Sequence, residues 1–326
     1  MRTLAIINQK GGCGKTTSAI NLAGAFARRG YRTLLVDMDP QSHCAAGLAI
    51  PEQRIDLDIG DAMLSTQPVD PTRLLWRAAR NLDLAPSRTK VAGLEAMRGG
   101  LADKADKEKR LRKVLETLAP SYEVCIIDCS PSIGLLTYNA LTAADGVLIP
   151  VETSFFSLQG ATKQVHTVRS LSKRLGVPFA CWLLGTIHDA ESPLAKDLLD
   201  ELRRRFTTRV APVVIHRDDA IREAASFGQP VIEYSPTSRG ARDYFDLAEW
   251  LVGRQGLQLD APSSADPLEG AFDPIETETG VEIVSTEESE AELAKRVSAR
   301  DAEDVQISRA QDLRNRARAM SRREDI

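Results

Sequence analysis

The stretch Gln9-Lys10-Gly11-Gly12-Cys13-Gly14-Lys15-Thr16-Thr17 lies between two patterned segments near the N-terminus. The apolar run at residues 4–7 predicts a strand before it, and the apolar periodicity of residues 19–26 predicts a helix after it. A glycine-rich turn between a strand and a helix lets backbone N–H groups converge, and the helix start adds partial positive charge. The stretch therefore predicts a phosphate-binding loop.

The side chains of this loop have separate expected tasks. Lys15 can reach the β- and γ-phosphates of a nucleotide, and the Thr16 hydroxyl can bind Mg²⁺. The strict P-loop pattern has glycine where this chain has Gln9, and a second lysine, Lys10, opens the loop. An ordinary glycine turn is the alternative, but it leaves the motifs below unexplained. We expect ATP to contact Lys10, Gly11, Gly12, Cys13, Gly14, Lys15, Thr16 and Thr17.

Composition limits the class of protein. The 326 residues, 43% of them hydrophobic, are enough for one large α/β domain or two smaller ones. The five cysteines are scattered and odd in number, without a CxxC loop, which indicates a reducing compartment and no structural zinc. The N-terminus has no signal-peptide pattern, and no apolar run approaches the ~20 residues of a spanning helix. We expect a cytoplasmic protein that does not insert into a membrane.

Charge is distributed unevenly. Residues 257–326 hold 17 acidic and 9 basic side chains, and residues 257–292 hold 11 acids without a lysine or arginine. We expect a disordered acidic linker over residues 256–285 and a charged helical tail over residues 286–326. The tail includes a thin apolar stripe in its Arg-rich stretch, residues 309–323, and is either a solvated helix or a docking helix for a partner.

The first 255 residues alternate between strand and helix patterns. Short β-branched runs suit parallel strands covered on both faces, so we expect a doubly wound α/β fold with a mostly parallel sheet of about seven to eight strands and helices on both faces. The expected strands are residues 3–8, 33–37, 81–85, 124–128, 146–151, 179–187 and 212–215. The expected helices are residues 16–29, 89–98, 106–118, 133–142, 158–175, 193–205, 219–226 and 239–253.

Acidic residues stand at two predicted strand ends. Asp37 and Asp39 leave the second strand on the same side, where one carboxylate could hold Mg²⁺ and the other could orient an attacking water. Two solvated acids in a turn are the alternative. Asp128 ends an apolar strand and suits a carboxylate associated with Mg²⁺. Arg217 and Asp218 follow a late strand and are candidates for contact with the base of the nucleotide.

Taken together, these motifs resemble the ParA/MinD class of deviant P-loop ATPases, and more closely its ParA branch. The resemblance spans about residues 1–253. It rests on KGGCGKTT at residues 10–17, DMDPQ at 37–41, CIIDCSPS at 125–132, GVLIPVETSFFSLQG at 146–160 and EAASFGQPVIEYSPTSRGARDYFDLA at 223–248.

The resemblance implies an ATP-dependent sandwich dimer and a weak ATPase stimulated by a partner. Lys10 matches the signature lysine, which reaches the partner subunit's nucleotide, and Asp39 matches the residue that supports hydrolysis. Lys15 and Thr16 match the phosphate and Mg²⁺ residues, and Asp37 and Asp128 match the Mg²⁺-associated acids. Arg217 and Asp218 fall where relatives place an Arg-Asn pair near adenine.

ParA relatives coat the nucleoid without sequence specificity and partition a chromosome or plasmid with a ParB-like partner. This chain has Glu191 and Ala220 where such relatives have arginines, which puts DNA binding in doubt. An alternative basic patch could come from Arg203, Arg204 and Arg205, with Arg222 nearby, although an arginine run is also typical of a solvated helix face.

Several other functions stay open. An orphan ParA-like ATPase could position a protein cargo instead of DNA. A MinD-like protein that cycles on membranes needs bulky apolar anchors, and residues 309–323 offer only Leu313 and Met320. Metabolic enzymes with this loop are expected to lack the DMDPQ segment together with Lys10, and iron–sulfur relatives need paired cysteines. A scaffold that binds ATP without hydrolysing it is a further alternative.

Overall fold

In the computed structural model, residues 1–95, 100–154, 157–254 and 257–260 are described. The chain divides into two units, Met1–Leu268 and Glu269–Ile326. Most of the predicted acidic linker and all of the charged tail lie outside the described residues, so both stay predictions. In the short described piece, Leu257 is fully buried and its N–H donates to the Arg254 carbonyl, so the chain still packs on the fold there.

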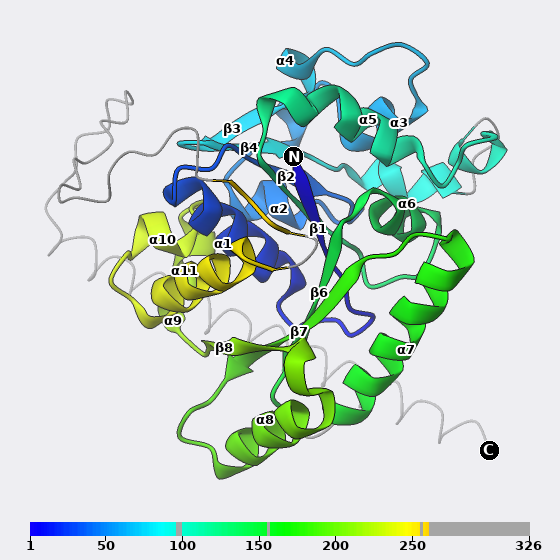
Figure 1. Ribbon diagram of the computed structural model, residues 1–326. Helices are drawn as coiled ribbons and strands as arrows, with labels where there is room; N and C mark the ends of the chain where they lie inside the picture. Colours follow the sequence, from blue (N-terminus) through cyan, green and yellow to red (C-terminus); the bar gives the residue numbers. More distant parts are fainter. Residues whose placement is uncertain (96–99, 155–156, 255–256, 261–326) are drawn as a thin grey trace, which may run out of the picture. The chain divides into compact units, whose positions relative to one another are not determined.

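A sheet of eight strands runs through the first unit in the order β3-β4-β2-β5-β1-β6-β7-β8 (Figure 1). Every neighbouring pair is parallel except β3–β4, so the expected doubly wound, mostly parallel sheet is confirmed. The strands are β1 (Arg2–Ile6), β2 (Thr33–Asp37), β3 (Trp76–Ala79), β4 (Leu82–Ala85), β5 (Val124–Asp128), β6 (Gly146–Glu152), β7 (Ala180–His188) and β8 (Val210–His216).

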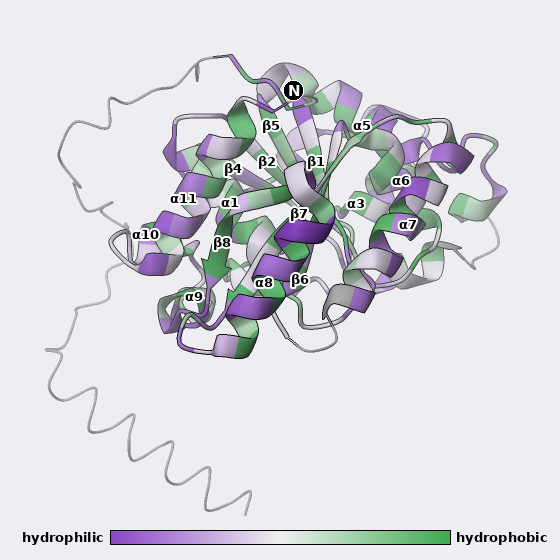
Figure 2. Ribbon diagram, turned by 60° about the horizontal axis from the view of Figure 1, so that its bottom comes forward, coloured by the Kyte–Doolittle hydropathy of each residue, from purple (hydrophilic) through white to green (hydrophobic). Residues whose placement is uncertain are grey.

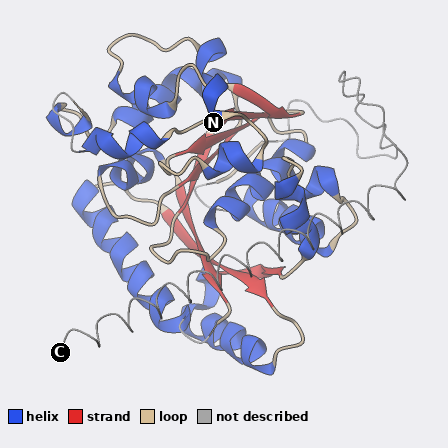
Figure 3. Ribbon diagram, turned by 180° about the vertical axis from the view of Figure 1, so that it is seen from behind, coloured by secondary structure: helices blue, strands red, loops and turns tan. Residues whose placement is uncertain are grey.

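Helices cover both faces of this sheet (Figure 3). They are α1 (Lys15–Arg28), α2 (His43–Gly47), α3 (Ile59–Leu64), α4 (Pro71–Leu74), α5 (Arg110–Leu118), α6 (Leu135–Ala143), α7 (Ser157–Leu175), α8 (Pro193–Phe206), α9 (Asp219–Ser226), α10 (Val231–Tyr234) and α11 (Arg239–Val252).

The core consists of two apolar layers, one on each face of the sheet. Along β1, Leu4 and Ile6 belong to the layer that includes α1 and α11, whereas Ala5 belongs to the layer that includes α5, α6 and α7. Because both faces of the central strands β2 and β5 are buried, their sequences are largely apolar up to the aspartate that ends each of them. Figure 2 shows this arrangement as hydrophobic strands inside helices with hydrophilic outer sides.

The structure corrects several expected elements. The helix expected over residues 89–98 is a 3₁₀-helix, Thr89–Glu95, and residues 96–99 lie outside the described part. Val91 and Leu94 are both buried, and a spacing of three suits the 3₁₀ repeat. The edge strand β3 was not expected because its side chains are only partly buried and show no apolar alternation. The short helices α2, α3, α4 and α10 were also missed.

Candidate nucleotide-binding site

The glycine loop connects β1 to α1 in a conformation that suits glycine. Gly12 has φ 72° and Gly14, the N-cap of α1, has φ 84°, and both values lie in the left-handed region that disfavours a side chain. The Cys13 carbonyl accepts a hydrogen bond of 2.9 Å from the Thr186 hydroxyl in β7. The loop is therefore anchored to a strand that lies two positions away in the sheet.

Lys15 points back into this loop. Its side chain is buried, and its ammonium donates a 3.0 Å hydrogen bond to the Lys10 carbonyl. This bond holds a positive charge among the converging backbone N–H groups, where phosphate oxygens would bind. The expectation that Lys15 belongs to the phosphate site agrees with this position.

Three of the predicted metal residues meet beneath the loop. Asp37 of β2 and Asp128 of β5 are paired in the sheet register, because the two strands are parallel neighbours. The Thr16 hydroxyl at the start of α1 donates a 2.7 Å hydrogen bond to Asp128 Oδ2. The sequence placed Asp37 and Asp128 at separate strand ends and Thr16 in the loop, and the strand order brings the three together.

The two acids disfavour each other's ionised form. Burial raises the pKa of Asp37 well above its usual range, and the Asp128 charge raises it further. Burial likewise raises the pKa of Asp128 to about 6, against the lowering effect of the Thr16 hydrogen bond. Asp128 Oδ1 is buried without a hydrogen-bond partner. Hard oxygen donors with surplus negative charge fit Mg²⁺, which Thr16, Asp37 and Asp128 would hold directly or through water.

Cys44 is a member of this cluster that the sequence did not reveal. Its thiol lies 3.5 Å from Asp128 Oδ2, and its backbone N–H donates to Asp37 Oδ2 at 3.1 Å. Burial raises its pKa well above the usual range, so the thiol stays protonated and donates. The only signal in the sequence was its position a few residues after Asp37.

Asp39 differs from Asp37 in what it faces. Asp37 accepts hydrogen bonds from the backbone N–H groups of Asp39 and Cys44 and is fully buried. Asp39 accepts from the Gln41 N–H and lines the cavity beside the loop. The structure thus places Asp37 in the buried cluster with Asp128 and Asp39 in the wall of the cavity, two positions that the spacing alone did not distinguish.

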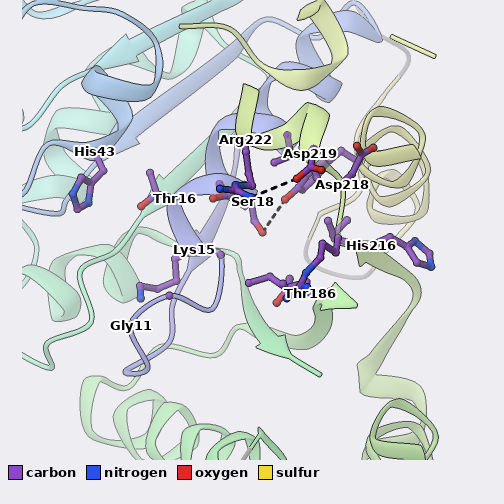
Figure 4. Close-up of a pocket in the computed structure, with 18 of the residues that line it drawn as sticks. Gly11, Lys15, Thr16, Ser18, His43, Thr186, His216, Asp218, Asp219 and Arg222 are labelled. Carbon is purple, nitrogen blue, oxygen red and sulfur yellow. Dashed lines mark hydrogen bonds and ion pairs between the residues drawn. The ribbon is translucent and has the colours of Figure 1, made fainter. Parts of the chain in front are cut away.

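The cavity has a volume of about 850 Å³, which is large enough for a nucleotide. Figure 4 shows Lys15 and Thr16 on one side of it and His216, Asp218 and Asp219 on the other. The second side is formed by the ends of β7 and β8 and by α9 and α11. Lining residues to which the sequence assigned no role are Ser18, Gln41, His43, Pro131, Thr186, Ile187, Asp219, Ile221 and Tyr244.

Arg217 and Asp218 lie in the wall of this cavity, as expected for residues near a base. The Asp218 carboxylate accepts hydrogen bonds from Ala220 N–H at 2.9 Å and Gly240 N–H at 2.7 Å. It therefore caps α9 and ties that helix to the start of α11. Arg222, which the sequence offered for DNA contact, instead lines the cavity and pairs with Asp219 at 3.4 Å.

The arginine run of α8 is largely neutralised within its own helix. Arg203 lies 3.8 Å from Asp200, and Arg204 lies 2.7 Å from Glu201. Arg205 is exposed to solvent. None of the three arginines lines the cavity.

Lys10 is half-exposed at the opening of the loop. Its ammonium forms an ion pair with Glu152 at the end of β6 and lies 3.3 Å from the Ser154 hydroxyl.

No helix within the described ranges is long and apolar enough to cross a membrane.

Comparison with known proteins decides the family. A family model described as an AAA domain matches residues 1–179, more than half of the chain. The chromosome partitioning protein ParA of Myxococcus xanthus is 38% identical over 268 residues, which cover 81% of this chain and 90% of that protein. The chain belongs to the ParA/Soj/MinD family of P-loop ATPases. The sporulation initiation inhibitor protein Soj of Bacillus subtilis is 39% identical over 249 residues, 76% of this chain and 97% of Soj.

Solved structures share the fold of this ParA-family chain. Cobyrinic acid a,c-diamide synthase from Mycobacterium smegmatis, solved with bound ADP and magnesium, aligns with a TM-score of 0.66 and 29% identity over 78% of this chain and 97% of that one. A variant of McdA from Cyanothece in complex with ATP aligns with a TM-score of 0.67 and 21% identity over 77% of this chain and 95% of the McdA chain. The second likeness concerns the fold alone.

Proposed function

We propose that this chain binds Mg²⁺–ATP in the cavity, dimerises around the nucleotide, and hydrolyses it to partition or position chromosomal or plasmid DNA with a ParB-like partner. The observation that carries the proposal is the meeting of Thr16, Asp37 and Asp128 beneath the glycine loop. A buried carboxylate pair with an unsatisfied oxygen suits a Mg²⁺ ion, and the adjoining cavity has room for a nucleotide.

In this proposal, different residues bind the phosphates, bind the metal and activate the attacking water. Lys15 and the N–H groups of the loop bind the phosphates, and Thr16, Asp37 and Asp128 hold the metal, whose charge would neutralise the phosphate oxygens. Asp39 faces the cavity and orients or deprotonates the attacking water. Lys10 stands half-exposed at the loop opening, where a second subunit's nucleotide could be reached.

The test is an ATPase assay combined with sedimentation. We expect weak ATP turnover that a ParB-like partner increases, and ATP-dependent pelleting with non-specific duplex DNA but not with liposomes. The protein is then expected in the cytoplasm, associated with the nucleoid. Pelleting with liposomes alone would replace the proposal with a membrane-cycling function.

The positioning of a protein cargo without DNA is a second candidate. Two observations favour it: Glu191 and Ala220 occupy positions where DNA-binding relatives have arginines, and Arg203 and Arg204 are paired with acids of their own helix. ATP-dependent dimerisation without any pelleting of duplex DNA would support this function over DNA partition.

A further inference from the structure

Helix α7 presents a face whose charge is entirely positive. Its 19 residues, Ser157–Leu175, include no aspartate or glutamate. Val165 and Val168 point into the apolar layer on one face of the sheet, whereas Lys163, Arg169 and Lys173 are exposed. Figure 1 shows α7 as a long helix along the flank of the fold.

The exposed cations are spaced along one side of this helix. Lys163, His166, Ser170 and Lys173 recur every three or four residues, so they share a face, and Arg169 adjoins it. Lys173 follows Lys163 by ten positions, which corresponds to about 15 Å along the axis. Duplex DNA carries one phosphate per about 3.4 Å of each strand, so a stripe of this length can meet several phosphates.

The cations of this stripe are not neutralised by neighbouring acids. Among the residues that the structure describes, no ion pair involves Lys163, Arg169 or Lys173. On the adjacent α8, by contrast, Arg203 and Arg204 have acidic partners at i−3. The two helices carry similar numbers of cations, but on α7 only Arg174 has an acidic partner among the described residues, Glu108 at 3.8 Å, which leaves Lys163, Arg169 and Lys173 for an external anion.

The positive surface continues beyond α7. Burial raises the pKa of Cys181, at the start of β7, to about 11, and Arg209 and Arg169 both act to lower it. The geometry agrees, because Arg209 directly precedes Val210, which pairs with Leu183 of β7, and Cys181 packs against the apolar layer that includes α7. Arg209 is also exposed. The basic surface thus combines two segments that are 40 positions apart in the sequence.

We propose that this surface, the α7 stripe of Lys163, Arg169 and Lys173 with Arg209 beside it, binds the phosphate backbone of double-stranded DNA. This inference rests on the proposed DNA-partitioning function. The surface would supply the DNA contacts that relatives are expected to make with arginines at the positions of Glu191 and Ala220. Binding of this kind depends on the charge of the DNA backbone and not on the base sequence, because the lysine and arginine side chains contact phosphates.

The experiment compares two variants of the full chain with an equal reduction in charge. Lys163→Gln/Arg169→Gln/Lys173→Gln removes the stripe, and Arg203→Gln/Arg204→Gln/Arg205→Gln removes the arginine run of α8. Binding to a non-specific duplex in the presence of Mg²⁺–ATP is measured across a series of salt concentrations. The plot of log K against log[salt] is expected to flatten by about 0.9 for each phosphate that is no longer neutralised, hence by about 2 to 3 for the α7 variant. The α8 variant is expected to keep most of the wild-type slope.

Two further measurements separate this inference from the proposed function. Both variants are expected to keep ATP-dependent dimerisation and basal ATP turnover, because neither set of residues lines the nucleotide cavity. An unchanged salt slope in the α7 variant, or failure of the wild-type dimer to bind duplex DNA, would overturn the DNA surface while ATPase activity stands. Loss of partner stimulation with intact DNA binding would also overturn it and would identify the stripe as a surface for an acidic protein.

Discussion

The Lys10 ammonium is paired with the Glu152 carboxylate of the same chain. Glu152 ends β6, and the Ser154 hydroxyl lies 3.3 Å from the same ammonium, so the tip of one strand holds the cation at the loop opening. A lysine that contacts the nucleotide of a second subunit has to leave these partners. The ion pair is therefore expected to favour the monomer.

Glu152→Gln tests this relationship. The substitution removes the charge that holds Lys10 but keeps the size of the side chain, so ATP-dependent dimerisation is expected at lower protein concentration. Exposed ion pairs contribute up to about 1 kcal/mol, which corresponds to about fivefold in the dimerisation constant. Analytical ultracentrifugation with ATP measures that constant, and weaker dimerisation would show that Glu152 assists assembly.

Lys10→Ala should weaken ATP-dependent dimerisation, whereas Glu152→Gln should strengthen it. The loop keeps Lys15 and its glycines, so the variant is expected to bind ATP but to form no hydrolysis-competent dimer. Nucleotide affinity from fluorescence titration and dimer content from gel filtration with ATP check the two parts. An active ATP-bound dimer of unchanged size would remove Lys10 from the intersubunit contact.

Asp39→Ala is expected to separate nucleotide binding from hydrolysis. Asp39 lines the cavity and accepts one backbone hydrogen bond from Gln41, whereas Asp37 lies in the cluster with Asp128 that we propose as the metal site. ATP binding and dimerisation should persist, and turnover should fall about 10²- to 10⁴-fold because a carboxylate that handles the water is removed. A variant that turns over ATP at the wild-type rate would contradict this role.

Asp128→Asn should preserve or raise the stability of the nucleotide-free protein and reduce the stabilisation by Mg²⁺–ATP. Burial raises the pKa of Asp128 to about 6 and also raises the pKa of Asp37 well above its usual range, so removing one carboxylate relieves an unfavourable buried charge. The nucleotide-free melting temperature is expected to stay equal or rise. The increase in melting temperature on adding Mg²⁺–ATP should shrink, since we expect binding to weaken about 10- to 100-fold. An unchanged increase would place the metal elsewhere.

Two glycines with similar backbones test how closely the turn after α9 packs against the segment that follows α2. Gly228, between α9 and α10, has φ +71°, and an added Cβ would lie 2.3 Å from Ala49 Cβ. Gly176 has φ +66° with open space around it. Gly176→Ala should cost about 1–2 kcal/mol for the left-handed backbone alone. Gly228→Ala should cost a further ~1–3 kcal/mol for overpacking. Equal losses of stability in chemical denaturation would mean that the Ala49 contact relaxes freely.

Local patterns in the sequence were enough to predict the principal elements that surround the site. Apolar runs identified β2 and β5 with their observed bounds, and the cavity-facing helix α9 was also predicted correctly. Short or partly buried elements such as β3 and α10 were not predictable, because four residues carry too little periodicity. The 3₁₀ geometry of Thr89–Glu95 depends on how Val91 and Leu94 pack, which no local pattern encodes.

The sequence by itself was enough to identify the family and to predict a phosphate-binding loop with its companion acids, because glycine spacing and residues at strand ends are local properties. Only the tertiary structure decided which acids share a buried site and which one faces the cavity. Strand order sets that distinction, since Asp37 and Asp128 meet across neighbouring parallel strands. Charge on the helices is a local property by contrast: the sequence alone shows that α7 has no acid and that α8 has acids three positions before Arg203 and Arg204, whereas the fold decides that Lys163, Arg169 and Lys173 lie on the exposed side of α7.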